Sequence, residues 1–514
     1  MTAATKERRA PRRFAPAWPS WKRTTFLTCL LIVGAAAATA HGQPLRPWHL
    51  VVGLLVAFGF LGSWRGQLIS TSVRYWIPMA LRNRGGHSGG KDEEGGQQAA
   101  TPLDDHSRGA EADPVAHIVI QLRRPPHRVL TPENADDQLP WQTVLSWLNR
   151  YGIQADCLNI TAVTRIPPQS GLRRDVAAAV TARTPQNRDT WLTYTLRAGS
   201  NVDALRARRV GIADLAVVTS RRLVAELREQ GWLATVCDHP DRLARFVPPG
   251  AAIRRECWTA TEYPDGFRAV YAVADPERLD GLLPSLPAAR TTWVSTMVRC
   301  RAGQPATVEA HVGLLTAARP VHNPAPGLRG FHGRHHELAP LICATGSSLP
   351  AGVLRSSPID PRSFSLPWHA SATGVPIGTD RQGRAHYLGL ASPEPVRITV
   401  TGSAEFGVGI VARLALSGLP IAVYAGGDRW KQLANHAGPQ QVLIAPADPT
   451  PGAIVVTDDS GSAPPIPAGG ISVLLRRPQQ AAAPATTIVI TQSTQAGLFD
   501  ITTAHGRLRL STRL

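Results

Sequence analysis

A strand–helix–strand pattern is clearest in PVRITVTGSAEFGVGIVARLALSGLPIAVYAGG, residues 395–427. It opens with a β-branched run, continues through an apolar helix that ends at Gly418, and closes with a second buried strand. A further helix is predicted over 428–438, with Asp428 as its N-cap. Because strands joined by helices pair in parallel, we expect an α/β fold for this part of the chain.

The turn GSAEFGVG within this pattern, residues 402–409, is the best candidate for a nucleotide-binding loop. A P-loop requires Gly-Lys-Ser/Thr, and the turn has no lysine. A dinucleotide fingerprint requires its first two glycines two residues apart, whereas Gly402 and Gly407 are separated by five. We interpret these glycines as turn and packing residues, and we expect no cofactor and no catalytic residues.

Upstream of this unit, residues 114–318 also mix predicted strands and helices. Apolar or alternating runs predict strands such as 115–122 and 153–164, and helical spacing predicts helices over 141–152 and 220–231. We therefore expect a mixed α/β domain, formed by one sheet with helices on at least one face.

The irregular region that follows, residues 319–394, contains a histidine cluster. His332, His335 and His336 stand close together, but their spacing fits no zinc-binding motif. We expect an exposed, solvated cluster and no metal site.

Near the start of the chain lie two apolar segments, TTFLTCLLIVGAAAATA (24–40) and WHLVVGLLVAFGFLGSW (48–64). Each has 17 residues and no charge, which is just long enough to span a bilayer as a helix. The turn-forming linker between them predicts a transmembrane hairpin. The alternative for the first segment is a signal peptide cleaved after Ala38-Thr39-Ala40.

The distribution of charge predicts the orientation of this hairpin. The chain has 514 residues and a net charge of +18, of which the first 84 residues carry +11 and the remaining 430 carry +7. Since cytoplasmic flanks of spans collect Lys and Arg, both termini are expected in the cytoplasm and the hairpin in the bacterial inner membrane. After residue 84 no basic run with interleaved aromatics indicates nucleic-acid binding.

The flanks of the spans supply the candidate functional residues. Residues 65–84 mix arginines with aromatic and aliphatic side chains, so they are expected either to lie at the membrane interface or to extend the second helix. The residues predicted to set topology or to contact the interface are Arg12, Arg13, Lys22, Arg23, Trp48, Trp64, Arg65, Arg74, Arg82 and Arg84.

The predicted organisation follows from these segments. It comprises a basic N-terminus (1–23), the transmembrane hairpin (24–64), a basic juxtamembrane segment (65–84), a flexible linker (85–113), a cytosolic α/β domain (114–318), an irregular Pro/Gly/His-rich region (319–394) and a C-terminal α/β unit (395–514).

The order of these features resembles the EccE family of type VII (ESX) secretion systems in mycobacteria and related actinobacteria. The resemblance is carried by the Arg-rich start, the paired spans, Trp64-Arg65-Gly66 and the pattern W-x-x-V-L-x-W-L-x-R-Y-G-I from Trp141 to Ile153. The strand–helix unit at 396–438 is also similar to the later part of longer family members.

The resemblance implies a non-catalytic structural subunit of the ESX membrane complex. It implies EccB-, EccC- and EccD-like partners in a hetero-oligomer, with the mycosin protease as a further partner. The alternative from the residues themselves is a membrane-anchored transferase that acts on a nucleotide-linked or lipid substrate at the glycine-bearing turn.

Overall fold

The computed structural model of the chain describes a set of separate stretches. They are residues 14–16, 62–64, 67–84, 113–123, 129–130, 138–165, 188–237, 253–287, 289–300, 305–343, 356–366, 374–390, 395–438, 441–446, 453–458, 470–478 and 486–512. The predicted span 24–40 and all but the end of the span 48–64 lie outside the described residues.

The chain divides into two compact units. Unit 1 combines Met1–Lys91 with Ala251–Asp265 and Phe331–Leu338, and unit 2 combines Asp92–Gly250, Gly266–Gly330 and Ala339–Leu514. The predicted mixed α/β fold is confirmed in unit 2, which holds two sheets with helices packed on them.

The first sheet of unit 2 is antiparallel. Its strands follow the order β12-β14-β13-β7-β8-β4-β9, with β15 beside β12 and β16 beside β14. The bounds are β4 (Val115–Arg123), β7 (Ile153–Arg165), β8 (Arg188–Arg197), β9 (Leu233–Val236), β12 (Gly266–Val273), β13 (Thr291–Arg299), β14 (Thr307–Thr316), β15 (Leu328–Gly330) and β16 (Ser357–Pro358).

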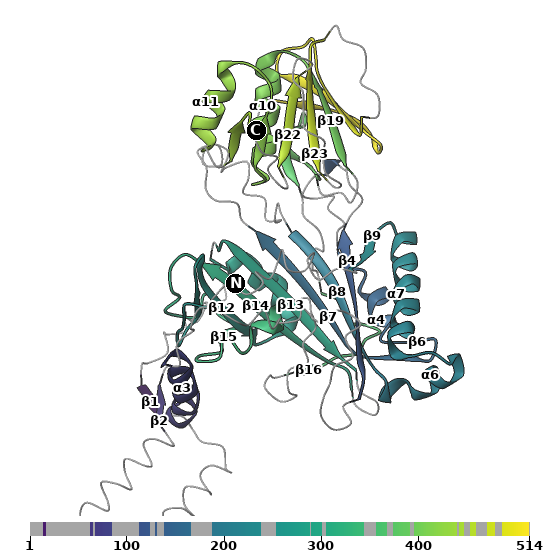
Figure 1. Cartoon of the computed structure of the whole chain (residues 1–514), viewed down its shortest axis with the longest axis vertical. Coiled ribbons are helices and arrows are strands. Elements are labelled where there is room, and N and C mark those ends of the chain that lie inside the picture. Colours follow the sequence, from purple (N-terminus) through teal and green to yellow (C-terminus); the bar gives the residue numbers. More distant parts are fainter. Residues whose placement is uncertain are drawn as a thin grey trace, which may run out of the picture. The chain divides into compact units, whose positions relative to one another are not determined.

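The helix α7 (Ile212–Glu229) packs on one end of this sheet, against β4 and β9 (Figure 1). Its apolar stripe is buried: Leu215, Leu223 and Leu227 are all fully shielded from solvent. The predicted helix 220–231 is confirmed, and it begins eight residues earlier than expected. The short helix α6 (Val202–Arg208) precedes it.

The predicted helix over 141–152 is wrong in its second half. Helix α4 spans only Trp141–Ser146, and the chain then enters strand β6 (Asn149–Arg150), which pairs with β7. Tyr151 and Gly152 both have positive φ, 56° and 71°, and form the two-residue turn between these strands. Leu148 is buried, as its helical spacing from Trp141 predicts, but Tyr151, the next position of that spacing, is 55% exposed.

On the sheet, a glycine permits a close approach of a covering segment. A Cβ on Gly313 in β14 would lie 2.3 Å from Cδ1 of Ile342 and 3.2 Å from the Trp293 ring. Ile342 belongs to the 3-10 turn η4 (Ala339–Ile342), within the region predicted to be irregular. The absence of a side chain at this position therefore lets η4 pack directly on the strand.

The second sheet of unit 2 joins a parallel half to an antiparallel half. Its order is β21-β20-β22-β23-β19-β24, all parallel, and then β25-β26-β17-β18-β5. The bounds are β5 (Val129–Leu130), β17 (Val375–Thr379), β18 (Ala385–Leu388), β19 (Val396–Thr401), β20 (Ile421–Val423), β21 (Val442–Ile444), β22 (Ile454–Asp458), β23 (Ile471–Arg476), β24 (Ile488–Gln492), β25 (Leu498–Thr503) and β26 (Gly506–Ser511).

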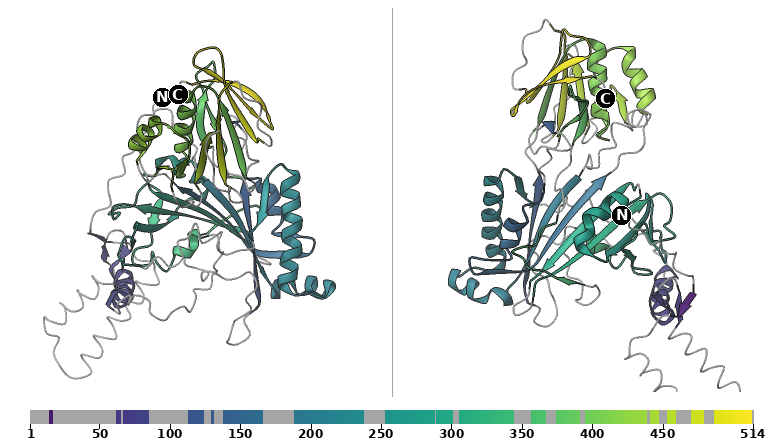
Figure 2. Two further views of the ribbon diagram at one scale, coloured as in Figure 1. Left: turned by 45° about the horizontal axis from the view of Figure 1, so that its top comes forward. Right: turned by 180° about the vertical axis from the view of Figure 1, so that it is seen from behind.

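The strand–helix–strand prediction is confirmed in the parallel half. Helices α10 (Ala404–Ala415) and α11 (Asp428–Ala437) lie side by side against the sheet (Figure 2). Their inward side chains share one core with the strands. The N-cap prediction is wrong, because Gly427 with φ 122° occupies that position and Asp428 lies in the first turn.

The glycine-bearing turn is filled by the protein itself. A Cβ on Gly402 would lie 2.7 Å from both the Phe406 ring and Oε1 of Gln492. The Ser403 amide donates to Gln492 Oε1 at 2.7 Å, and the Phe406 amide donates to Ser403 Oγ at 3.2 Å. These two amides at the start of α10 are thus already engaged, which does not favour phosphate binding and supports a packing role for Gly402.

Among the residues of unit 1 that the structure describes, the longest element is the helix α3 (Ile69–Arg84). Strand β1 (Phe14–Pro16) pairs with β2 (Gly62–Trp64), which pairs with β3 (Gln67–Leu68), and β10 (Arg255–Glu256) pairs with β11 (Thr261–Tyr263). Within the described part of the chain, no helix is both long and apolar enough to cross a membrane.

Replacing Gly313 by Ala should destabilise unit 2. The new methyl group would overlap Ile342, and overpacking of this kind costs about 1–3 kcal/mol. Thermal unfolding of the detergent-solubilised full chain should show a lower Tm. Gly281→Ala is the matched control, because a Cβ there meets nothing within 4 Å; equal Tm values for the two variants would contradict the packing argument.

His311 should make the stability depend on pH. Burial, followed by the charge of Arg299, lowers its pKa to about 3, whereas an unfolded histidine titrates near 6.5. The unfolded chain therefore binds the proton more readily between these values, so stability is lost as the pH falls through this window. His311→Leu should show a smaller drop in Tm between about pH 7 and about pH 4.5 than the wild type, while exposed His436→Leu should retain the wild-type drop.

Candidate interaction surface on helix α3

Helix α3 presents an apolar face to solvent. The exposed fractions are 48% for Val73, 54% for Trp76, 48% for Ile77 and 59% for Leu81. These positions are spaced i, i+3, i+4 and i+8, so the four side chains form one stripe along the helix. Large apolar side chains that gather on one face, rather than lie scattered, mark a surface for a partner or a membrane.

The charges on α3 are all positive. Arg74 and Arg84 are exposed, and the sequence of the helix contains no Asp or Glu. The basic residues Arg82 and Arg84 occupy its last turn, where they also interact favourably with the helix dipole. The exposed face of α3 therefore combines apolar and cationic side chains.

The opposite face of α3 is fixed to the rest of unit 1. Ser72 and Met79 are buried, at 5% and 7% exposure. Tyr75, which lies between them, is covered by Arg334, whose guanidinium carbon is 5.0 Å from the ring centroid. Arg334 also donates to Glu337 at 2.8 Å, and this hydrogen bond lowers the pKa of the Glu337 carboxyl group.

A buried carboxylate holds the C-terminal end of α3. Glu256 is 4% exposed and accepts two hydrogen bonds from Arg82, from Nε and Nη2, at 2.7 Å each. Asn83 adds a reciprocal pair, since its side chain donates to the Glu256 carbonyl at 2.8 Å and accepts from the Glu256 amide at 2.9 Å. A bidentate Arg–carboxylate pair of this kind is geometrically specific and fixes the helix in orientation.

The histidine cluster packs beside this contact. His335 is buried at 3% exposure, and His332 stacks on Trp258 with ring centroids 5.9 Å apart. The prediction of an exposed cluster is therefore wrong: the loop is pressed against Trp258 because Gly333, with φ 73°, carries no side chain that would clash with that ring. Among the described residues, no group of three His, Cys, Asp or Glu could hold a metal ion.

The residues predicted to contact the membrane interface differ in their positions and contacts in the structure. Arg74 and Arg84 are exposed on α3, Arg82 is paired with Glu256, and Trp64 ends strand β2. Outside the described residues lie Arg12, Arg13, Lys22, Arg23, Trp48 and Arg65.

The alternative that 65–84 continues the second predicted helix is wrong. Residues 62–64 form β2, and the antiparallel β2–β3 pairing reverses the chain before α3 begins.

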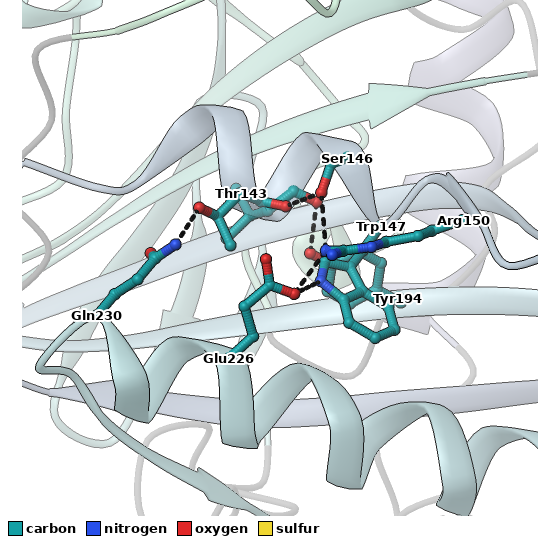
Figure 3. A network of polar contacts seen from close by, with 8 residues as sticks. Thr143, Ser146, Trp147, Arg150, Tyr194, Glu226 and Gln230 are labelled. Atoms are coloured by element: carbon teal, nitrogen blue, oxygen red, sulfur yellow. Dashed lines mark hydrogen bonds and ion pairs between the residues drawn. The ribbon is translucent and has the colours of Figure 1, made fainter.

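A second polar network joins α4 and β6 to α7 (Figure 3). Glu226 of α7 accepts from Trp147 Nε1 at 2.8 Å and from Arg150. Gln230 donates to Thr143 Oγ1 at 2.7 Å.

On the sheet side of the same network, the Tyr194 hydroxyl of β8 donates to the carbonyl of Val144 at 2.6 Å. Burial raises the pKa of Tyr194 well above its ordinary value, so the hydroxyl stays protonated and keeps this bond. Together with the bonds from α7, it fixes the short helix α4 on the sheet.

Comparison with known proteins gives a match to one family model over part of these elements. The family described as "Putative type VII ESX secretion system translocon, EccE" matches residues 184–273, a range that includes β8 and ends with β12. This part of the chain is similar to the EccE family. The matched part contains Tyr194, Glu226 and Gln230 of the network, and Glu256 of the α3 contact.

Individual relatives show the same similarity. The ESX-3 secretion system protein EccE3 of Mycolicibacterium smegmatis is 28% identical over 345 residues, covering 64% of this chain and 93% of the relative. The protein of the same name from Mycobacterium tuberculosis (strain CDC 1551 / Oshkosh) is 29% identical over 267 residues, covering 51% of this chain and 65% of the relative.

Breaking the Arg82–Glu256 pair should loosen α3. Arg82→Ala leaves a buried carboxylate with fewer donors, which costs about 1–3 kcal/mol, and amide hydrogen exchange in α3 should speed up roughly tenfold or more. Arg84→Ala removes an exposed charge from the same turn and should leave exchange unchanged.

A double variant distinguishes loss of the Arg82–Glu256 ion pair from a general effect of mutating this site. In Arg82→Gln with Glu256→Gln, neither side chain carries a charge, so part of the protection should return. If Arg82→Ala exchanges at the wild-type rate, Glu256 does not hold the helix.

Proposed function

We propose that this protein is a member of the EccE family and a non-catalytic structural subunit of a type VII (ESX) secretion complex in the bacterial plasma membrane. The names of its relatives support a place in such a system. Its anchor in this proposal is the apolar hairpin 24–64 with both termini in the cytoplasm. Its partners are EccB-, EccC- and EccD-like subunits and the mycosin protease.

The single observation that carries the membrane part of the proposal is the exposed face of α3. Val73, Trp76, Ile77 and Leu81 would enter the boundary between headgroups and acyl chains. Full burial of a large apolar side chain contributes about 1.5–3 kcal/mol, so side chains that are half exposed add about 1 kcal/mol each.

Arg74 and Arg84 would contact lipid phosphates in the same arrangement. An arginine near an anionic membrane contributes about 1 kcal/mol, and the absence of acids from α3 avoids repulsion from the headgroups. Arg82 is reserved for Glu256, so its part in this proposal is to orient the helix. The helix then lies in the plane of the membrane rather than across it.

The depth of α3 in the membrane can be measured directly. Leu81→Cys, in a full chain whose Cys29 and Cys300 are replaced by Ser, can be labelled with an environment-sensitive fluorophore and reconstituted in anionic vesicles. We expect blue-shifted emission and quenching by brominated lipid. Val321→Cys, at a position that is 58% exposed, is the control and should stay unquenched; a water-like signal at position 81 would contradict the proposal.

Membership of the complex has its own test. The detergent-extracted full chain, affinity-purified from its own host, should bring EccB-, EccC- and EccD-like subunits with it in fixed ratio. Recovery of the chain alone would overturn the structural role.

A further inference from the structure

The hairpin turn between β6 and β7 displays an aromatic side chain at a strained position. Tyr151 has φ 56° and is 55% exposed. The first residue of such a two-residue turn is usually Asn, Asp or Gly, because a bulky side chain at positive φ costs free energy. Backbone strain that is retained although about half of the side chain stays exposed points to a function for that side chain.

Arginines from three elements surround this tyrosine. The guanidinium carbon of Arg150 lies 5.0 Å from the Tyr151 ring centroid, and that of Arg222 on α7 lies 5.6 Å from it. Arg208 of α6 donates from Nη2 to the Tyr151 carbonyl at 2.9 Å. The ring is therefore held by cation–π contacts, and the turn itself is tied to α6.

The outer face of α7 continues this surface. Val217 and Val218 are 42% and 44% exposed, and they lie one helical turn before the exposed Arg221 and Arg222. We call Arg150, Tyr151, Arg208, Val218, Arg221 and Arg222 the Tyr151 surface. Glu226, the carboxylate beneath it, is already engaged by Trp147 and Arg150.

We propose that the Tyr151 surface docks an acidic segment of a partner protein. A guanidinium that stacks on a ring still directs its N–H edge outward, where it can hold a carboxylate in bidentate fashion. Tyr and Arg are enriched in protein interfaces, and a tyrosine offers large contact area at low entropic cost. Exposed Val218 offers an apolar contact to a peptide segment, which a polyphosphate backbone could not use.

The rigid base beneath the surface suits such docking. Glu226, Gln230 and Tyr194 fix α4 and β6 on α7 and β8, so the turn is presented in one conformation before a partner arrives (Figure 3). Preorganisation of this kind lowers the entropic cost of association. The inference rests on the proposed function only in that the partner is taken from the same membrane complex.

The test uses a photo-crosslinking phenylalanine derivative in place of Tyr151 in the full chain, expressed in its own host. Irradiation should give a protein adduct whose crosslinked peptide, identified by mass spectrometry, carries an excess of Asp and Glu. The same residue at exposed Val321 should not give that adduct. A lipid adduct, a nucleic-acid adduct, a peptide without acidic excess or no adduct at all would overturn the proposal.

Charge variants test how strongly the yield of the crosslinked adduct depends on the arginines of the Tyr151 surface. Arg222→Glu should lower the adduct at least about threefold through loss of charge complementarity, and Arg222→Gln should lower it less. Arg397→Glu changes the charge equally at an exposed position on β19 and should leave the adduct unchanged. An adduct that is insensitive to Arg222→Glu, with the wild-type Tm retained, would also overturn the proposal.

The experiments distinguish failure of the docking proposal from failure of the proposed structural role. If the wild-type chain purifies with its complex but position 151 crosslinks to no acidic segment, only the docking inference falls. If the wild-type chain purifies alone, the structural role falls first.

Discussion

A carboxylate that is removed from water must have donors around it, and Glu256 finds them on helix α3. Because the carboxylate is almost fully buried, loss of its two hydrogen bonds with Arg82 would leave an uncompensated buried charge and would destabilise the fold. The pair determines which face of α3 packs against the rest of unit 1. With that face buried, the apolar stripe from Val73 to Leu81 lies on the opposite face of the helix and is exposed.

The mixed apolar and basic character of α3 could be predicted from the sequence, but the Arg82–Glu256 contact that holds the helix could not. Arginines mixed with aromatic residues at 65–84 are visible as a pattern. Glu256 is a lone acid in the sequence, and its partner Arg82 lies 174 residues away, so no local spacing connects them. The contact between Arg334 and Tyr75 could not be predicted either, because it joins distant parts of the chain.

The fold shows a comparable division between what is local and what is not. The strands of the parallel half were predictable because strands buried on both faces, such as β20 and β22, are continuous apolar runs. Strand β26 alternates and keeps one face exposed, so its pattern is weaker and it was missed. The predicted helix over 141–152 is longer than α4 because Leu148 and Tyr151 continue the helical spacing from Trp141, although the backbone has already become a hairpin.

Strand β5 has a consequence for the order in which the protein can form. Val129 and Leu130 pair with Leu388 and Tyr387, so the edge of the second sheet is supplied by a segment synthesised more than 250 residues before its neighbour. A growing chain must hold this short strand unpaired until most of the polypeptide has left the ribosome. Closing so large a loop is slow, and it makes completion of the C-terminal sheet a late event in biogenesis.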